Sequence, residues 1–200
     1  GSITNDISLN GNWAYDVEFR PDDGGYTLFV ANYSSNIITA YDTDTNSPMV
    51  DLMVQSVSTF AISPDGSLLA AIDSLNQDVL VFQLSDYSLQ RVIDPPSWIN
   101  DLAFSSDGQF LFGSDGTSQL MRWDLYNDYA QYNYTVDTIY LNTLSIANNG
   151  QYAAWSGYRD WGVIDLITGY AVFDSSAFDA FDLFPDNING GFYKYYTDYT

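Results

Sequence analysis

The sequence has no cysteine and no histidine, and it is very poor in cations. Without cysteine there are no disulfides, and without cysteine and histidine there are no thiolate or imidazole metal sites. The missing histidine also excludes Ser-His-Asp and Cys-His nucleophile systems and an imidazole pH switch. Proton chemistry is therefore left to carboxylates, tyrosines and one lysine, Lys194.

The balance of charge is strongly acidic. Five Lys and Arg residues face 26 Asp and Glu residues, which gives a formal net charge of −21 at pH 7 in a chain of 200 residues. Such a field repels nucleic-acid phosphate and anionic lipid, so we exclude nucleic acid as a partner. No apolar run approaches the roughly 18 residues of a membrane span, so we expect no membrane insertion.

The residues that are present favour strands and turns. Glu18 is the only glutamate, so almost all acids are aspartates, which prefer turns to helix surfaces. Aromatic residues make up 17% of the chain, and aromatic side chains fit pleated, half-buried strands. We therefore expect one all-β domain with a sizeable core.

An internal repeat runs along the chain. A turn signal such as Ser63-Pro64-Asp65-Gly66 follows an apolar strand five times, and its closing glycines are residues 24, 66, 108, 150 and 190. An alternating apolar strand precedes each turn, and a more continuous apolar strand follows it. A third strand then ends in an apolar-polar pair such as Trp123-Asp124, and a shorter fourth strand follows in the first four repeats. Four strands in about 40–45 residues, joined by tight turns, are typical of a β-propeller blade.

Two segments resemble known propeller families. Residues 28–46 look like the YVTN repeat of bacterial and archaeal surface propellers. Residues 98–108, followed by Ser114-Asp115-Gly116-Thr117 and Arg122-Trp123-Asp124, look like a WD40 repeat, although the Gly-His pair of that family is missing. The resemblance covers about residues 13–200 and implies the fold rather than a particular function, because propellers carry many unrelated functions.

The repeat predicts a propeller of about five blades within a single domain, residues 3–200, with residues 1–2 read as a cloning scar. Four-stranded antiparallel blades are expected at about 13–54, 55–94, 95–137 and 138–174, and residues 175–200 supply two strands of an incomplete last blade. Two alternatives stay open. Residues 3–9 close a five-bladed ring, or the chain is a piece of a larger ring and self-association through an open edge is possible.

Candidate ligand-binding residues cluster at the positions where the chain enters each blade and in the loops between second and third strands. In WD40-like proteins these positions lie on the top face, the usual ligand surface. Exposed aromatic rings there would stack on sugars or anchor a peptide, and an arginine between aromatics would suit a carboxylate or a hydroxyl. The residues are Trp13, Tyr33, Trp98, Tyr140, Tyr158, Arg159, Trp161 and Phe178. The alternative interpretation is that these side chains pack between blades or form surface ion pairs.

One segment has the spacing of a calcium loop. Asp42, Asp44 and Asn46 place oxygen ligands at alternate positions, but the sixth-position glycine and twelfth-position glutamate of an EF-hand are missing. We interpret this segment as an ordinary Asx-rich turn, and we predict no metal site and no cofactor, with calcium the one candidate.

The sequence therefore predicts a non-catalytic extracellular or cell-surface module that binds a protein or a glycan, or a structural unit of a surface assembly. The first alternative is an intracellular, WD40-like protein-interaction scaffold in the cytoplasm. The second is a carboxylate-dependent hydrolase of the glycosidase kind, which would need two aspartates about 5–10 Å apart in a cleft.

Overall fold

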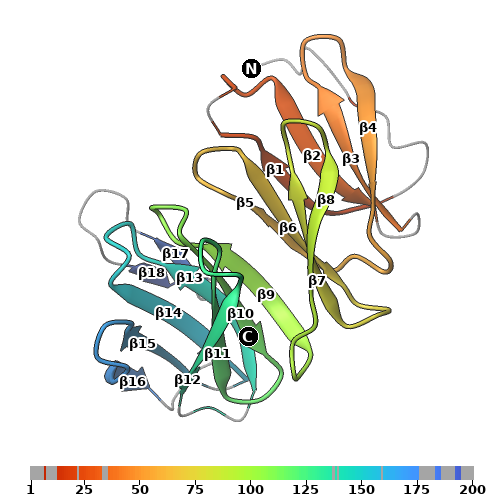
Figure 1. Cartoon of the computed structure of the whole chain (residues 1–200). Coiled ribbons are helices and arrows are strands. Elements are labelled where there is room, and N and C mark those ends of the chain that lie inside the picture. The colour runs from red at the N-terminus through yellow and green to blue at the C-terminus, as the bar shows by residue number, and fades with distance from the viewer. Residues whose placement is uncertain are drawn as a thin grey trace, which may run out of the picture. The chain divides into compact units, whose positions relative to one another are not determined.

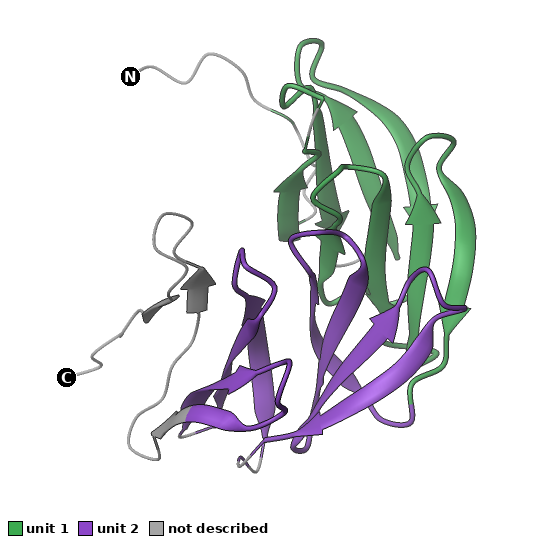
Figure 2. Cartoon of the chain, turned by 60° about the vertical axis from the view of Figure 1, so that its left-hand side comes forward, with its two compact units in different colours: residues 1–95 green, residues 96–200 purple. Residues whose placement is uncertain are grey.

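The computed structural model describes residues 7, 13–21, 23–32, 36–136, 138, 140–158, 160–175, 183–185 and 192–194. The chain divides into two compact units, residues 1–95 and residues 96–200 (Figure 2). Each unit has its own sheets and its own hydrophobic core.

Unit 1 contains two four-stranded antiparallel sheets, in which neighbours in the sequence are neighbours in the sheet (Figure 1). The first sheet consists of β1 (Ala14–Phe19), β2 (Thr27–Asn32), β3 (Ile37–Asp42) and β4 (Ser47–Met53). The second consists of β5 (Phe60–Ile62), β6 (Leu68–Asp73), β7 (Asp78–Gln83) and β8 (Ser88–Ile93).

Unit 2 repeats this arrangement twice and adds a two-stranded sheet. Its first sheet is β9 (Ile99–Phe104), β10 (Phe110–Asp115), β11 (Gln119–Asp124) and β12 (Ala130–Thr135). Its second is β13 (Leu141–Ile146), β14 (Tyr152–Gly157), β15 (Trp161–Asp165) and β16 (Ala171–Ser175), and the pair is β17 (Leu183–Pro185) and β18 (Phe192–Lys194). The predicted fold class, an all-β propeller with four-stranded antiparallel blades and an incomplete last one, is confirmed.

The described residues include no helix long and apolar enough to cross a membrane. The segment predicted to close the ring, residues 3–9, lies outside the described residues apart from residue 7. Closure, and with it the single-domain boundary, therefore stays a prediction.

The turn between first and second strands is built by an aspartate and a glycine. Asp65 Oδ1 accepts hydrogen bonds from the Ser63 hydroxyl at 2.6 Å and from the Ser67 amide at 3.0 Å. Partial burial raises the pKa of Asp65, but these hydrogen bonds outweigh it and hold the pKa below its usual value. Gly66 has φ +65°, a conformation that side chains other than glycine rarely adopt. The aspartate and the glycine of the Pro-Asp-Gly signal therefore stabilise the turn.

The core of each unit lies between neighbouring sheets. In unit 1, buried apolar side chains of β2, β3 and β4 meet those of β5, β6 and β7; they include Phe29, Ile38, Leu52, Phe60, Leu69 and Phe82. In unit 2, the corresponding cluster includes Phe112, Leu120, Leu144, Trp155 and Ile164. The second strands are buried along nearly their whole length, as their continuous apolar sequence predicts.

Aspartates on two first strands join neighbouring sheets by hydrogen bonds. Asp16 Oδ2 accepts the Thr59 hydroxyl at 3.1 Å and the Phe60 amide at 3.3 Å in unit 1. Asp101 Oδ2 accepts the Leu144 amide at 2.8 Å in unit 2. These bonds supply partners for amides at the edge of the next sheet, where no strand pairs with them.

Candidate functional site

A small hollow in unit 2 brings together two of the aromatic residues predicted from the sequence. It has a volume of about 240 Å³ and is lined by Ser97, Trp98, Asn100, Gly116, Thr117 and Tyr140. Trp98 and Tyr140 remain 54% and 47% exposed, so their rings are accessible to a ligand. The lining comes from the segment before β9, from β9, from the turn after β10 and from the segment before β13.

A buried carboxylate holds this region in place. Asp115 is only 1% exposed, and its two oxygens accept four hydrogen bonds. The donors are the hydroxyls of Ser97 and Thr117, at 2.8 and 2.7 Å, and the amides of Thr117 and Gln119, at 3.0 and 2.8 Å. Ser97 and Thr117 line the hollow, and the Asp115 carboxylate lies behind these two residues.

Two further hydrogen bonds fix the walls of the hollow. The Asn100 amide group donates to the Leu141 carbonyl at 2.7 Å, and the Gly116 amide donates to the Trp98 carbonyl at 3.1 Å. A Cβ on Gly116 would lie 3.7 Å from Asn100 Nδ2 and 3.8 Å from the Tyr140 ring, which are ordinary contact distances. Glycine at this position therefore keeps the hollow open, and a larger side chain would fill it.

The sequence analysis did not single out these buried carboxylates. Asp73 takes the place of Asp115 in unit 1: it is 3% exposed and accepts the amide and side-chain NH₂ of Asn76, both at 3.0 Å, and the Gln55 amide at 3.3 Å. A usable signal was present, because both aspartates stand seven positions after a turn glycine, Gly66 or Gly108. Each also accepts one hydrogen bond from a residue 18 positions earlier, Gln55 or Ser97, and the repeat pattern alone does not reveal these contacts.

The fourth sheet uses a different residue for the same purpose. Gly157 stands where the repeat has Asp115, and the carboxylate of Asp160 accepts the Thr138 hydroxyl at 2.8 Å instead. A Cβ on Gly157 would collide with the Asp160 carboxylate and the Thr138 hydroxyl. Asp160 therefore folds back into the space that a side chain at position 157 would occupy.

The other predicted ligand-binding residues do not join this hollow. Trp13 belongs to unit 1 and is 80% exposed. Tyr158 is exposed and Trp161 is partly buried; both follow β14 in unit 2, and neither lines the hollow. Tyr33, Arg159 and Phe178 lie outside the described residues.

Arg122 and Arg20, in the described part of the chain, are used inside the fold. The Arg122 guanidinium lies 4.6 Å from the centres of both the Phe110 and Tyr132 rings, and its Nη1 donates to the Tyr134 hydroxyl at 2.8 Å. Arg20 Nε donates to the Gly66 carbonyl at 3.0 Å, which links β1's turn to the next sheet. These charges stabilise packing, and the five cations are far fewer than the 26 acids of the chain.

The predicted calcium candidate has the hydrogen bonding of an Asx turn. Asp42 Oδ1 accepts the amides of Thr45 and Asp44, both at 2.9 Å, and these bonds hold the pKa of Asp42 below its usual value. Within the described part of the chain, no group of three or more acidic, His or Cys side chains is placed to hold a metal ion. Calcium binding at Asp42, Asp44 and Asn46 stays an untested prediction.

Comparison with known proteins supports the fold and the repeat. Residues 87–120 match the family model of the WD domain, G-beta repeat, and this segment contains most of the lining of the hollow. A search of the curated proteins found no match. A chain of Kuenenia stuttgartiensis hydrazine synthase is similar in structure, with a TM-score of 0.76 and 18% identity over 92% of this chain and 55% of that one.

These comparisons define the class of the protein by its fold: it is a β-propeller, and residues 87–120 are similar to a WD40 repeat. The chain spans only about 55% of the length of the hydrazine synthase chain. At 18% identity, that likeness concerns the fold alone. Propellers that contain WD40 repeats of the kind that residues 87–120 resemble generally bind proteins.

Proposed function

We propose that this protein is a non-catalytic interaction module that binds a basic peptide segment of a partner protein in the hollow lined by Trp98 and Tyr140. One observation carries the proposal: two accessible aromatic rings line a hollow that adjoins the buried Asp115 carboxylate. Aromatic rings of this kind anchor partners at low cost in side-chain entropy, because each has two side-chain torsions.

The size of the hollow favours a single side chain as its occupant. Its volume of about 240 Å³ lies below the roughly 300–1,000 Å³ of sites that enclose a drug-sized molecule. A peptide would therefore lie over the surface and insert one residue between the lining groups.

The charge of the protein favours a basic residue in that place. A Lys or Arg side chain over the Trp98 or Tyr140 ring gains a cation–π interaction, and the Asp115 carboxylate adds attraction from one side. The net charge of −21 would speed the approach of a basic partner and repel an acidic one.

A location at the cell surface or outside the cell is part of the proposal. It is supported by the resemblance of residues 28–46 to a surface-propeller repeat, and the cytoplasmic scaffold is the alternative. A non-catalytic role is supported by the lack of histidine and cysteine in the sequence. Binding of a glycan by the same two rings is an alternative that the experiment below distinguishes.

The proposal is tested by probing the protein with an array of lysine- and arginine-containing peptides, matched acidic peptides and glycans, followed by titration of variants. Trp98→Ala and Tyr140→Ala should each weaken peptide binding by about 1–3 kcal/mol while leaving the fold intact. Tyr126→Ala is the control, because Tyr126 is 79% exposed in the same unit but lies outside the hollow.

Three results would contradict the proposal: binding of glycans but of no peptide, equal binding of acidic and basic peptides, or equal losses in Tyr126→Ala and Trp98→Ala. Circular dichroism of each variant distinguishes the loss of a binding contact from the loss of the folded structure.

A further inference from the structure

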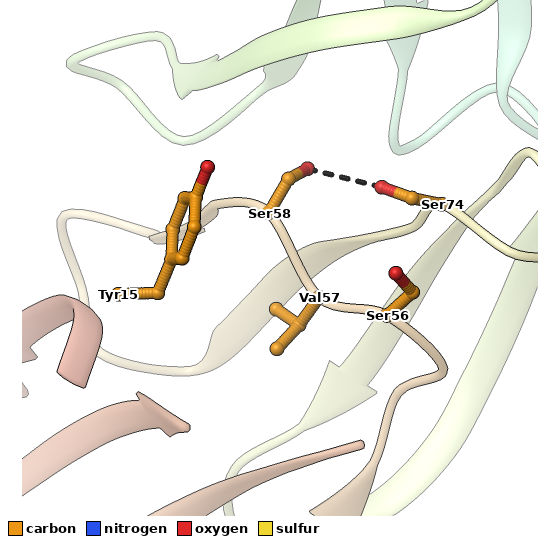
Figure 3. A pocket seen from close by; sticks show the side chains of 5 residues that line it. All are labelled: Tyr15, Ser56, Val57, Ser58 and Ser74. Carbon is orange, nitrogen blue, oxygen red and sulfur yellow. Dashed lines mark hydrogen bonds between the residues drawn. The ribbon is translucent and has the colours of Figure 1, made fainter. Parts of the chain in front are cut away.

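Unit 1 has a hollow of its own, with a different chemical lining (Figure 3). It measures about 300 Å³ and is lined by Tyr15, Ser56, Val57, Ser58 and Ser74. Tyr15 comes from β1, the middle three residues come from the segment between β4 and β5, and Ser74 follows β6. Four of its five lining side chains carry a hydroxyl group.

The repeat shows how the two hollows differ. Ser56, Ser58 and Ser74 stand 42 positions before Trp98, Asn100 and Gly116, which line the hollow of unit 2. In unit 1, serine hydroxyl groups therefore stand where unit 2 has the Trp98 indole ring, the Asn100 amide and Gly116. The aromatic ring that lines the unit 1 hollow is that of Tyr15. Equivalent positions of the repeat therefore carry different side chains, and the tyrosine ring comes from the preceding sheet in unit 1 but from the segment before the following sheet in unit 2.

The hydroxyl groups keep hydrogen-bonding capacity for a ligand. The Ser74 hydroxyl donates to the Ser58 hydroxyl at 3.2 Å (Figure 3). Because a serine hydroxyl has one donor and two acceptor positions, this bond leaves the Ser58 proton and further lone pairs available. Ser56 has φ +51°, and its amide donates to Asn36 Oδ1 at 2.9 Å, which fixes the shape of the segment that carries it.

Charge plays little part in this lining. None of the described side chains that line the hollow is ionisable near neutral pH, and the neighbouring Asp16 carboxylate already accepts the Thr59 hydroxyl at 3.1 Å. Tyr15 is 57% exposed, so one ring is accessible beside the hydroxyl groups. The site therefore suits a neutral ligand that has both hydroxyl groups and an apolar face.

We propose that this hollow binds a neutral sugar, such as the terminal residue of a glycan. Sugar hydroxyls would exchange hydrogen bonds with Ser56, Ser58 and Ser74, and the apolar face of the sugar ring would pack on Tyr15. The site belongs to unit 1, so it is independent of the peptide site proposed in unit 2.

Saturation-transfer NMR with glucose, galactose, mannose and N-acetylglucosamine, each at millimolar concentration, tests this assignment on the full chain. At least one sugar should receive saturation from the protein. Tyr15→Ala should weaken its binding about tenfold, the effect of about 1.4 kcal/mol, and Ser74→Ala about fivefold. Tyr26→Ala is a matched control, because Tyr26, just before β2 in the same unit, is 56% exposed but does not line the hollow.

Tyr15→Phe keeps the ring and separates stacking from hydrogen bonding if Tyr15→Ala does not fold. The assignment is overturned if none of the four sugars receives saturation, or if Tyr15→Ala and Ser74→Ala bind as tightly as the wild type. It is also overturned if the hollow takes up a peptide in place of a sugar. Trp98→Ala should leave sugar binding unchanged. The sugar site in unit 1 is therefore tested separately from the peptide site in unit 2.

Discussion

Glu18, the only glutamate, is a residue whose protonation links stability to pH. Burial, and to a lesser extent the nearby Asp16 carboxylate, raises the pKa of Glu18 from 4.5 to about 7, although the Ile62 amide donates to it at 3.1 Å and lowers the pKa. Since the pKa of Glu18 is higher in the folded state than in the unfolded state, protonation of Glu18 favours folding. This contribution to the free energy of unfolding is fully present below pH 4.5. It is lost as the pH rises through about 7.

We therefore expect Glu18→Gln to flatten the pH dependence of unfolding between pH 5 and 8. A pKa rise from 4.5 to about 7 corresponds to a loss of up to about 3 kcal/mol in the wild type over this range. Urea unfolding at several pH values measures it, with the wild type and Glu18→Gln similar at pH 5 and the variant more stable at pH 8. Parallel curves for the two proteins would show that Glu18 does not titrate in this way.

At the scale of the elements, the order and ends of the strands were predictable from the sequence. The third strands end at the apolar-polar pairs that the repeat marks, as at Trp123-Asp124 for β11. The turn glycines were predictable because the turn geometry requires positive φ at Gly66 and its equivalents. The Ser97–Asp115 hydrogen bond and the substitution of Asp160 for a residue at position 157 were not, because they depend on contacts between segments 18 and 22 residues apart in the sequence.

The loop after β14 gives a stability prediction. Gly157→Ala should destabilise the protein by about 1–3 kcal/mol, because its Cβ would displace the Asp160 carboxylate from the Thr138 hydroxyl and collide with the Tyr140 backbone carbonyl. Gly116→Ala is the matched control at the equivalent turn after β10, where a Cβ meets only ordinary contacts, and it should change stability by less than about 0.5 kcal/mol. Chemical denaturation measures both, and an equal effect of the two substitutions would contradict the placement of Asp160.

For the whole molecule, the dominant feature is uncompensated negative charge. Mutual repulsion of the acidic side chains weakens the folded state. Sodium chloride screens this repulsion, so we expect it to raise the melting temperature. In a chain of this length, each kcal/mol gained in the free energy of unfolding corresponds to a rise of about 2–4 °C. Calcium chloride at matched ionic strength should do no better if the Asp42 segment is only a turn. A calcium-specific rise that Asp44→Ala abolishes would instead establish a calcium site there.

The candidate binding site was partly predictable. The repeat placed aromatic residues at the blade entries, and Trp98 and Tyr140 indeed line one hollow. The sequence did not show that Trp161 would be partly buried, or that serines at the equivalent place in unit 1 would form a hollow with Tyr15. Exposure and hollows depend on how side chains of several strands meet, and a pattern along one strand does not contain that information.

The most direct test of the central claim is a calorimetric titration of a lysine-containing peptide selected from the array into the wild type and into Gly116→Leu. The leucine side chain fills the hollow without removing any of its groups, and position 116 has room for a Cβ. We predict that the wild type binds and that Gly116→Leu, folded and equally stable, binds at least about tenfold more weakly. Equal affinity of the two proteins for the peptide would contradict the assignment of the Trp98–Tyr140 hollow as the binding site.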